Sequence, residues 1–77
     1  MNLDEIHIGR LIRNKLKEKK HTALWLAQKI HCDRSNIYKI FKKPSIDTDL
    51  LLKINMVLNT DFFACYSELY RSMKDKL

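Results

Sequence analysis

Four hydrogen-bonding side chains lie close together in the segment "RSNIYKIF", residues 34–41. They are Arg34, Ser35, Asn36 and Lys39. A guanidinium offers paired donors and an amide offers a donor beside an acceptor, so both suit recognition of planar polar edges. In the same segment Ile37, Ile40 and Phe41 recur at helical spacing and predict one apolar face. The segment therefore predicts a short helix with one buried face and one polar, basic face, on which Ser35, Lys39 and Lys42 fall.

The preceding residues predict two helices that support this one. An amphipathic first helix is expected over about residues 6–19, with Ile8, Leu11, Ile12 and Leu16 on its apolar side. Asp4 or Glu5 would favour its N-terminal end. Gly9 lowers the helix propensity, and the close approach of another helix is its expected reason.

The second helix is expected over residues 23–30. Thr22 is positioned as its N-cap, and Ala27 lies where a larger side chain would hold a neighbouring helix away. Asp33 is then expected to cap the third helix, which Pro44 ends.

Two more helices follow Pro44. Ser45 or Asp47 can cap a fourth, whose apolar face comprises Leu50, Leu51, Ile54, Val57 and Leu58. Asn59 can take a left-handed terminating conformation. Thr60 or Asp61 is expected to cap a fifth helix, which carries Phe62, Phe63 and Tyr66.

Positive charge is concentrated in one part of the chain. Residues 10–43 carry eleven basic and two acidic side chains, a net charge of +9, whereas residues 44–77 carry four basic and five acidic ones. This asymmetry indicates a polyanionic partner, with an anionic membrane surface and a merely solvated lysine-rich surface as competing interpretations. The membrane interpretation is the weaker, because the apolar residues of the first helix are needed for the core.

The sequence shows no pattern typical of a catalytic or metal site. Cys32 and Cys65 are far apart and form no CxxC pair, so two partly buried thiols are expected rather than a disulfide or a zinc site. His7 and His21 have no identifiable catalytic partner, and a single glycine excludes the usual nucleotide-binding loops. We therefore expect no enzyme, no metal and no cofactor. The absence of a signal-peptide pattern indicates a cytoplasmic protein.

Over about residues 6–66 the chain resembles the lambda-repressor-like, or XRE-type, helix-turn-helix family. The matching segments are "IGRLIRNKLKEK", "TALWLAQKI", "RSNIYKIF" and "PSIDTDLLLKINMVLNTDFF". Apolar residues at the positions that lock the two helices of the motif together are Leu26, Ala27, Ile30, Cys32, Ile37 and Ile40. The resemblance implies an all-α fold, a compact bundle of about five short helices in which the second and third form the helix-turn-helix.

The resemblance also implies binding of double-stranded DNA, with the third helix reading bases in the major groove. The expected base-reading residues are Arg34, Ser35, Asn36 and Lys39. The expected contacts to the DNA backbone are Thr22, Tyr38, Lys42, Lys43, Arg13 and Lys17. Where the family's turn usually has a glycine this sequence has His31, so either His31 adopts a positive φ or the turn has a different shape.

Residues 1–66 are expected to form the DNA-binding domain, and residues 67–77 a C-terminal extension that is either a dimerisation helix or a frayed tail. Helical spacing of apolar residues in "YSELYRSMKDKL" predicts a symmetric homodimer contact. Its candidate residues are Trp25, Phe63, Tyr66, Leu69, Tyr70 and Met73. Trp25 lies off the core face of its helix, so the first helix, the C-terminal segment or another subunit is expected to cover it.

A small transcriptional regulator is thus the leading hypothesis, and a homodimer on double-stranded DNA its expected form. The alternative is an antitoxin or adaptor that acts mainly through a protein partner, such as a toxin, and binds DNA secondarily. With no ligand-sensing domain expected, control would depend on partner proteins, proteolysis or concentration.

Overall fold

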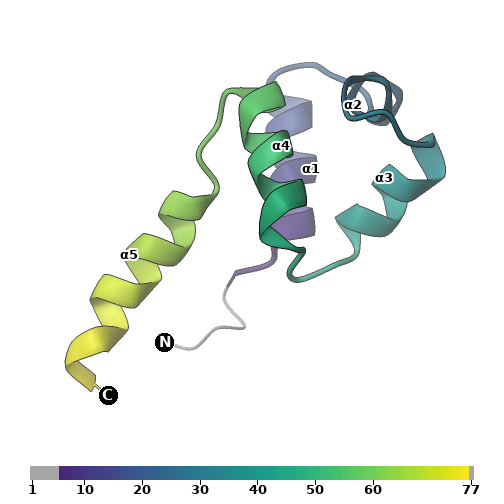
Figure 1. The fold of residues 1–77 in the computed structure, drawn as a ribbon. Helices are drawn as coiled ribbons and strands as arrows, with labels where there is room; N and C mark the ends of the chain where they lie inside the picture. Colours follow the sequence, from purple (N-terminus) through teal and green to yellow (C-terminus); the bar gives the residue numbers. More distant parts are fainter. Residues whose placement is uncertain (1–5, 77) are drawn as a thin grey trace.

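Helices make up most of the computed structural model, which describes residues 6–76 (Figure 1). The elements in chain order are α1 (Ile8–Glu18), α2 (Ala23–Lys29), α3 (Arg34–Phe41), α4 (Thr48–Leu58), α5 (Phe63–Met73) and the 3-10 helix η2 (Lys74–Lys76). No strand occurs among these residues. The predicted all-α class and the five α-helices are therefore confirmed.

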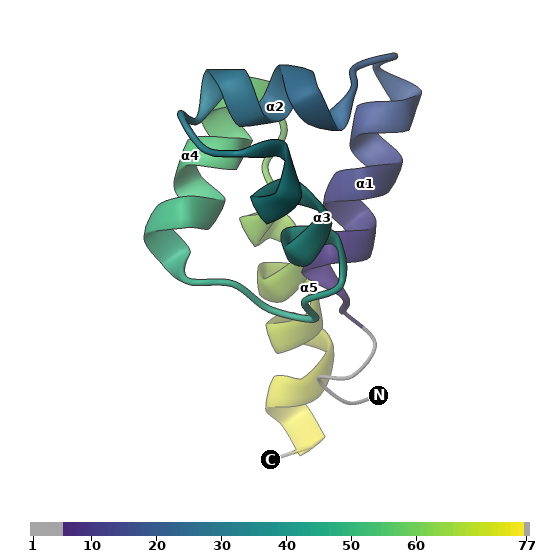
Figure 2. The ribbon, with the colours of Figure 1, turned by 90° about the vertical axis from the view of Figure 1, so that its right-hand side faces the viewer.

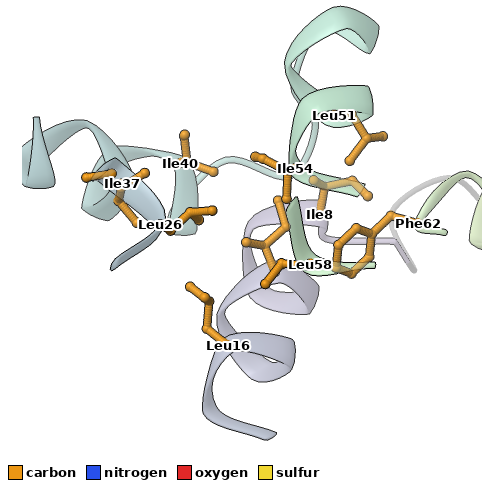
Figure 3. Packing of buried hydrophobic residues seen from close by; sticks show 11 residues of the cluster. Ile8, Leu16, Leu26, Ile37, Ile40, Leu51, Ile54, Leu58 and Phe62 are labelled. Atoms are coloured by element: carbon orange, nitrogen blue, oxygen red, sulfur yellow. The ribbon is translucent and has the colours of Figure 1, made fainter. Parts of the chain in front are cut away.

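Helices α1 to α4 surround one apolar core, and the C-terminal half of α5 extends beyond them (Figures 1 and 2). The core residues are Ile8, Ile12, Leu16, Leu26, Ala27, Ile37, Ile40, Leu51, Ile54, Leu58 and Phe62. Figure 3 shows these side chains converging from four helices and from the segment before α5. The apolar faces predicted for the first four helices thus meet in one cluster, and their burial is the main force that holds these short helices in place.

The first helix begins later than expected. It starts at Ile8 rather than near residue 6, and His7 is its N-cap, with Nδ1 accepting the backbone N–H of Arg10 over 3.0 Å. The first turn contains no acidic residue. Asp4 and Glu5, expected to favour this end, lie outside the described residues.

Gly9 allows α1 and α3 to approach closely, as predicted. The backbone N–H groups of Ile8 and Gly9 donate to the carbonyl oxygens of Pro44 and Lys43, each over 2.9 Å. A Cβ added at Gly9 would lie 2.5 Å from the carbonyl oxygen of Phe41. The segment after α3 is therefore fixed against the start of α1.

The caps of the last two helices are only partly those expected. Asp47, not Ser45, caps α4 by accepting the N–H of Leu50 over 2.8 Å. Asp61 accepts the N–H of Phe63 over 3.0 Å, so α5 begins at Phe63. Phe62, expected on the helix, precedes it and is buried in the core.

Asn55 is the buried polar residue of the described chain. Its Oδ1 accepts the backbone N–H of Phe62 over 3.3 Å, and its carbonyl oxygen accepts that of Thr60 over 3.0 Å. One side chain of α4 thereby positions the segment that leads into α5.

Candidate nucleic-acid interface

Residues 30–33 connect α2 to α3 through a left-handed residue. His31 has φ 59°, which is the positive φ considered for this position, and Cys32 donates its backbone N–H to the carbonyl oxygen of Ala27 over 2.9 Å. This hydrogen bond, from the second residue after the C-cap Ile30, is that of a Schellman motif. The turn therefore has the geometry that a glycine would favour, with a histidine in its place.

The same ending recurs on α1 and α4. Lys20 has φ 61° and Asn59 has φ 49°, and in each case the next residue donates to a carbonyl five positions back. The left-handed Asn59 was predicted, whereas the left-handed Lys20 was not. Three helices thus end in a turn whose left-handed residue is not glycine.

Buried side chains hold α2 and α3 together. Leu26 and Ala27 of α2 pack with Ile37 and Ile40 of α3, and all four are almost completely buried. Cys32 is half-buried against this cluster, and its burial raises the pKa of the thiol, with the Asp33 carboxylate adding to the effect. The thiol therefore stays protonated at neutral pH, as suits an apolar packing role.

The opposite side of α3 is open to solvent. Arg34, Ser35, Asn36 and Lys39 are all exposed, and within the described chain their side chains make no hydrogen bond or ion pair. In Figure 2, α3 lies at the front of the molecule, and no other helix covers its outward side. The four predicted base-reading residues are therefore all exposed and unpartnered within residues 6–76, with Ser35 and Lys39 opposite the buried Ile37 and with Arg34 and Asn36 to either side of them.

Asp33 begins α3 in a different way from that expected. Its backbone is extended and its carbonyl oxygen accepts the N–H of Asn36 over 2.9 Å, but its side chain makes no capping hydrogen bond. The N–H groups of the first turn of α3 therefore lack a side-chain acceptor from this residue. No acidic residue follows until Asp47, so the exposed face of α3 carries only positive charge.

The six residues expected at the DNA backbone are also exposed. They are Arg13, Lys17, Thr22, Tyr38, Lys42 and Lys43. Thr22 caps α2 as predicted, because its Oγ1 accepts the N–H of Trp25 over 3.0 Å, and its hydroxyl hydrogen can still donate. Tyr38 makes an edge contact with Phe41, with 5.9 Å between ring centroids. Arg13 and Lys17 lie on α1, Thr22 directly precedes α2, Tyr38 lies on α3, and Lys42 and Lys43 directly follow α3.

One basic residue of α1 already has an ionic partner. Lys15 Nζ lies 2.6 Å from Glu18 Oε2, and this contact holds the pKa of the Glu18 carboxyl below its ordinary value. This is the one ion pair within 4 Å in the part of the chain that the structure describes. The other exposed cations of residues 10–43 are therefore not neutralised by described carboxylates.

His21 and Lys29 contact Trp25, and neither was expected to do so. The imidazole of His21 stacks on the indole with 3.6 Å between centroids and 6° between planes, and Lys29 Nζ lies 5.8 Å from the indole centroid. The left-handed Lys20 directs the chain back so that His21 meets Trp25. Besides these contacts, Trp25 packs partly against the core.

The residues predicted for a dimer contact differ widely in exposure. Leu69 is 7% exposed in the single chain and Tyr70 is 66% exposed, whereas Phe63, Tyr66 and Met73 are half-buried. Helix α5 is continuous across the expected boundary between residues 66 and 67. Of the described α5 residues in this set, Tyr70 offers the largest free apolar surface.

A shallow groove borders α4 and the start of α5, and of its lining residues only Phe63 was predicted to take part in a contact. Its volume is about 470 Å³, and Leu52, Met56 and Phe63 supply its apolar lining. Met56 is 73% exposed. The helical spacing of Leu52 and Met56 places both residues off the core face of α4. Exposed apolar residues are too common on protein surfaces for this spacing alone to predict a groove.

Other kinds of site find little support within residues 6–76. No three histidine, cysteine or carboxylate side chains gather in a way that could hold a metal ion. No described helix is both long enough and apolar enough to span a bilayer.

Comparisons with known proteins give no match. No family model matches this sequence, and neither the curated proteins nor the solved structures contain a match.

Proposed function

We propose that this protein binds double-stranded DNA sequence-specifically, as a small transcriptional regulator whose helix α3 enters the major groove. The observation that carries the proposal is the free polar face of α3, where Arg34, Asn36 and Lys39 have no partner among the described residues. An α-helix with its side chains is about 10–12 Å in diameter, and a B-DNA major groove is about 12 Å wide and admits one α-helix. The diameter of α3 and the polar side chains on its exposed surface are therefore both compatible with binding in the major groove.

Each exposed residue of α3 has a role in this proposal. Arg34 makes a bidentate contact with the O6 and N7 acceptors of guanine, and Asn36 pairs with N6 and N7 of adenine. Ser35 and Lys39 contact base edges or phosphates nearby. Because α2 and α3 pack through fully buried side chains, α3 is held at a fixed angle to the rest of the molecule.

Contacts with phosphates supply most of the affinity. Arg13, Lys17, Lys42 and Lys43 offer charge, and the hydroxyl groups of Thr22 and Tyr38 offer neutral donors. The net charge of +9 over residues 10–43 attracts any duplex, whatever its sequence. The exposed face of α3 then discriminates among sequences.

Two copies of the chain act together in this proposal, because one reading helix covers only a few base pairs. The groove beside α4 and the exposed Tyr70 form the contact between them. Phe63 and Tyr70 are seven residues apart and share a face of α5. Residues 44–77 carry nearly balanced charge, so two copies approach there with little repulsion, whereas their +9 segments repel each other.

One observation favours a second candidate function, the antitoxin or adaptor. The same α4–α5 groove exposes Leu52 and Met56, and such a surface also suits an apolar helix of another protein. In that case DNA binding is secondary, and the protein partner replaces the second copy.

Selection of DNA sites from a random pool tests the leading proposal. The wild-type chain should enrich one short motif, and Arg34→Ala should lose about 1–3 kcal/mol at that motif and relax its preference at one base pair. Lys42→Ala is the matched control, because loss of a phosphate contact should weaken all sequences alike. Equal losses on all sequences for both variants would show that α3 does not read bases. Failure to enrich any motif would favour the second candidate.

A further inference from the structure

A second hollow lies beside the polar face of α3, and its interior is apolar. The turn after α2, the core side of α3 and the first turn of α4 supply its floor, formed by Ile30, Cys32, Ile40 and Leu50. Its volume is about 260 Å³. This is larger than the about 150 Å³ cavity that holds one benzene ring, and it approaches the about 300 Å³ at which small-molecule pockets begin. The space accommodates one ring or a short alkyl chain.

The rim of this pocket is cationic. Lys39, Lys43 and Lys53 line it together with Asn36, and the lining contains no acidic residue. These three lysines come from α3, from the segment after it and from α4, so the fold rather than the local sequence brings them together. None has a described carboxylate within 4 Å. Three ammonium groups around one apolar hollow repel one another, and a bound anion removes that repulsion.

We propose that this pocket binds a small organic anion, namely a carboxylate that carries one aromatic ring or a short alkyl chain. The ring or chain covers the apolar floor, and the carboxylate pairs with the lysines and accepts from the Asn36 amide. An inorganic anion would leave the floor uncovered. A neutral molecule of the same shape would leave the lysines unpaired.

The position of the pocket gives this binding a consequence, which rests on the proposed function. Asn36, Lys39 and Lys43 are shared between the pocket and the DNA-binding surface, whereas Lys53 belongs to the pocket alone. An anion in the pocket therefore competes with DNA for the shared groups. The domain that reads DNA would then itself respond to a metabolite.

Nuclear magnetic resonance titration at constant ionic strength tests the binding itself, with benzoate as the probe. The amides of Ile30, Cys32 and Leu50 should shift saturably, with a dissociation constant on the order of millimolar for so small a ligand. Benzyl alcohol and inorganic phosphate should bind at least about tenfold more weakly, a difference equivalent to about 1.4 kcal/mol. If either bound as well as benzoate, or if benzoate shifts did not saturate, the proposal would be overturned.

Two lysine variants test the location. Lys53→Gln should weaken benzoate binding about threefold, as expected for loss of one exposed charge contact, and should leave DNA binding in place. Lys74→Gln, on η2 away from the pocket, should change neither benzoate binding nor DNA binding. Equal benzoate affinity in all three proteins would overturn the assigned site.

Competition separates this proposal from the proposed function. Benzoate should displace a selected duplex from the wild type, and less effectively from Lys53→Gln. Saturable benzoate binding by a chain that binds no duplex would support the pocket and refute the DNA proposal. If the protein bound DNA but not benzoate, only the proposed anion pocket would be refuted. If benzoate and DNA bound at the same time, the proposed competition between them would be refuted.

Discussion

The backbone N–H of Gly9 donates to the carbonyl oxygen of Lys43 over 2.9 Å, so the first turn of α1 lies directly against the segment that follows α3. Gly9→Ala should therefore lower the free energy of unfolding by about 1–3 kcal/mol, because the added Cβ would overlap the carbonyl groups of Ile40 and Phe41. Urea denaturation measures this loss. Asn14→Ala, at an exposed position of the same helix, should preserve or slightly raise stability. A stabilised Gly9→Ala would mean that the helices are less tightly packed.

Salt should weaken DNA binding steeply. Four cationic side chains are proposed at phosphates, so the logarithm of the binding constant should fall with the logarithm of salt concentration with a slope of about −3.6 for each copy. Fluorescence anisotropy with a labelled duplex between low and physiological salt measures the slope. Lys42→Ala should reduce its magnitude by about 0.9. A binding constant that did not respond to salt would be incompatible with the proposed function.

His31→Gly should stabilise the fold. A left-handed conformation costs a non-glycine residue about 1–2 kcal/mol, and glycine would remove this cost at residue 31. The greater conformational freedom of glycine in the unfolded chain offsets about 0.5–1 kcal/mol of this stabilisation. The expected net gain is about 0.5–1 kcal/mol, measured by urea denaturation. Gln28→Gly, at an exposed position within α2, should instead lose about 1 kcal/mol. Equal losses at both positions would contradict the left-handed turn.

Asn55→Leu should loosen the start of α5. The substitution removes the side-chain acceptor of the Phe62 N–H, and an unsatisfied buried group costs about 1–3 kcal/mol. Hydrogen exchange of the Phe62 amide should accelerate relative to that of the Leu51 amide, which α4 protects independently. Unchanged exchange at Phe62 would show that the Asn55 side chain does not hold this segment.

Self-association should depend on the exposed apolar surface of α4 and α5. Met56→Asp combined with Tyr70→Asp should yield a helical monomer, whereas the wild type should sediment as a concentration-dependent dimer. Asn14→Asp controls for added negative charge and should preserve the dimer. Leu69→Asp should destabilise the fold itself, because Leu69 is buried within the single chain. A wild type that stays monomeric at high micromolar concentration would limit dimer formation to DNA.

Features that depend on local spacing were predictable from the sequence. The apolar repeats located the first four helices to within about two residues, and Thr22, Gly9 and Asn59 have the cap, close approach and left-handed conformation expected of them. In each case the residue type restricts its own backbone or its immediate neighbours. Ser35 and Lys39 also lie together for this reason, since helical periodicity places both opposite the buried Ile37, whereas Arg34 and Asn36 lie to either side of them.

Features that depend on distant parts of the chain were not predictable. Sequence spacing does not show that Lys53 lines the same pocket as Lys39 and Lys43, because the placement of α4 in the folded chain decides it. The stack of His21 on Trp25 requires the left-handed Lys20, a conformation that lysine rarely adopts. The N-cap of α1 likewise falls on His7, which is not among the preferred capping residues.

The stacked pair of His21 and Trp25 also gives the protein an intrinsic fluorescence signal that depends on its conformation. Trp25 is the single tryptophan, and it lies one turn from Thr22, a proposed phosphate contact. An indole held parallel to an imidazole emits differently when the imidazole leaves the stack or approaches a phosphate. Tryptophan emission can therefore follow unfolding and DNA docking at the start of α2 without a label on any residue of α3.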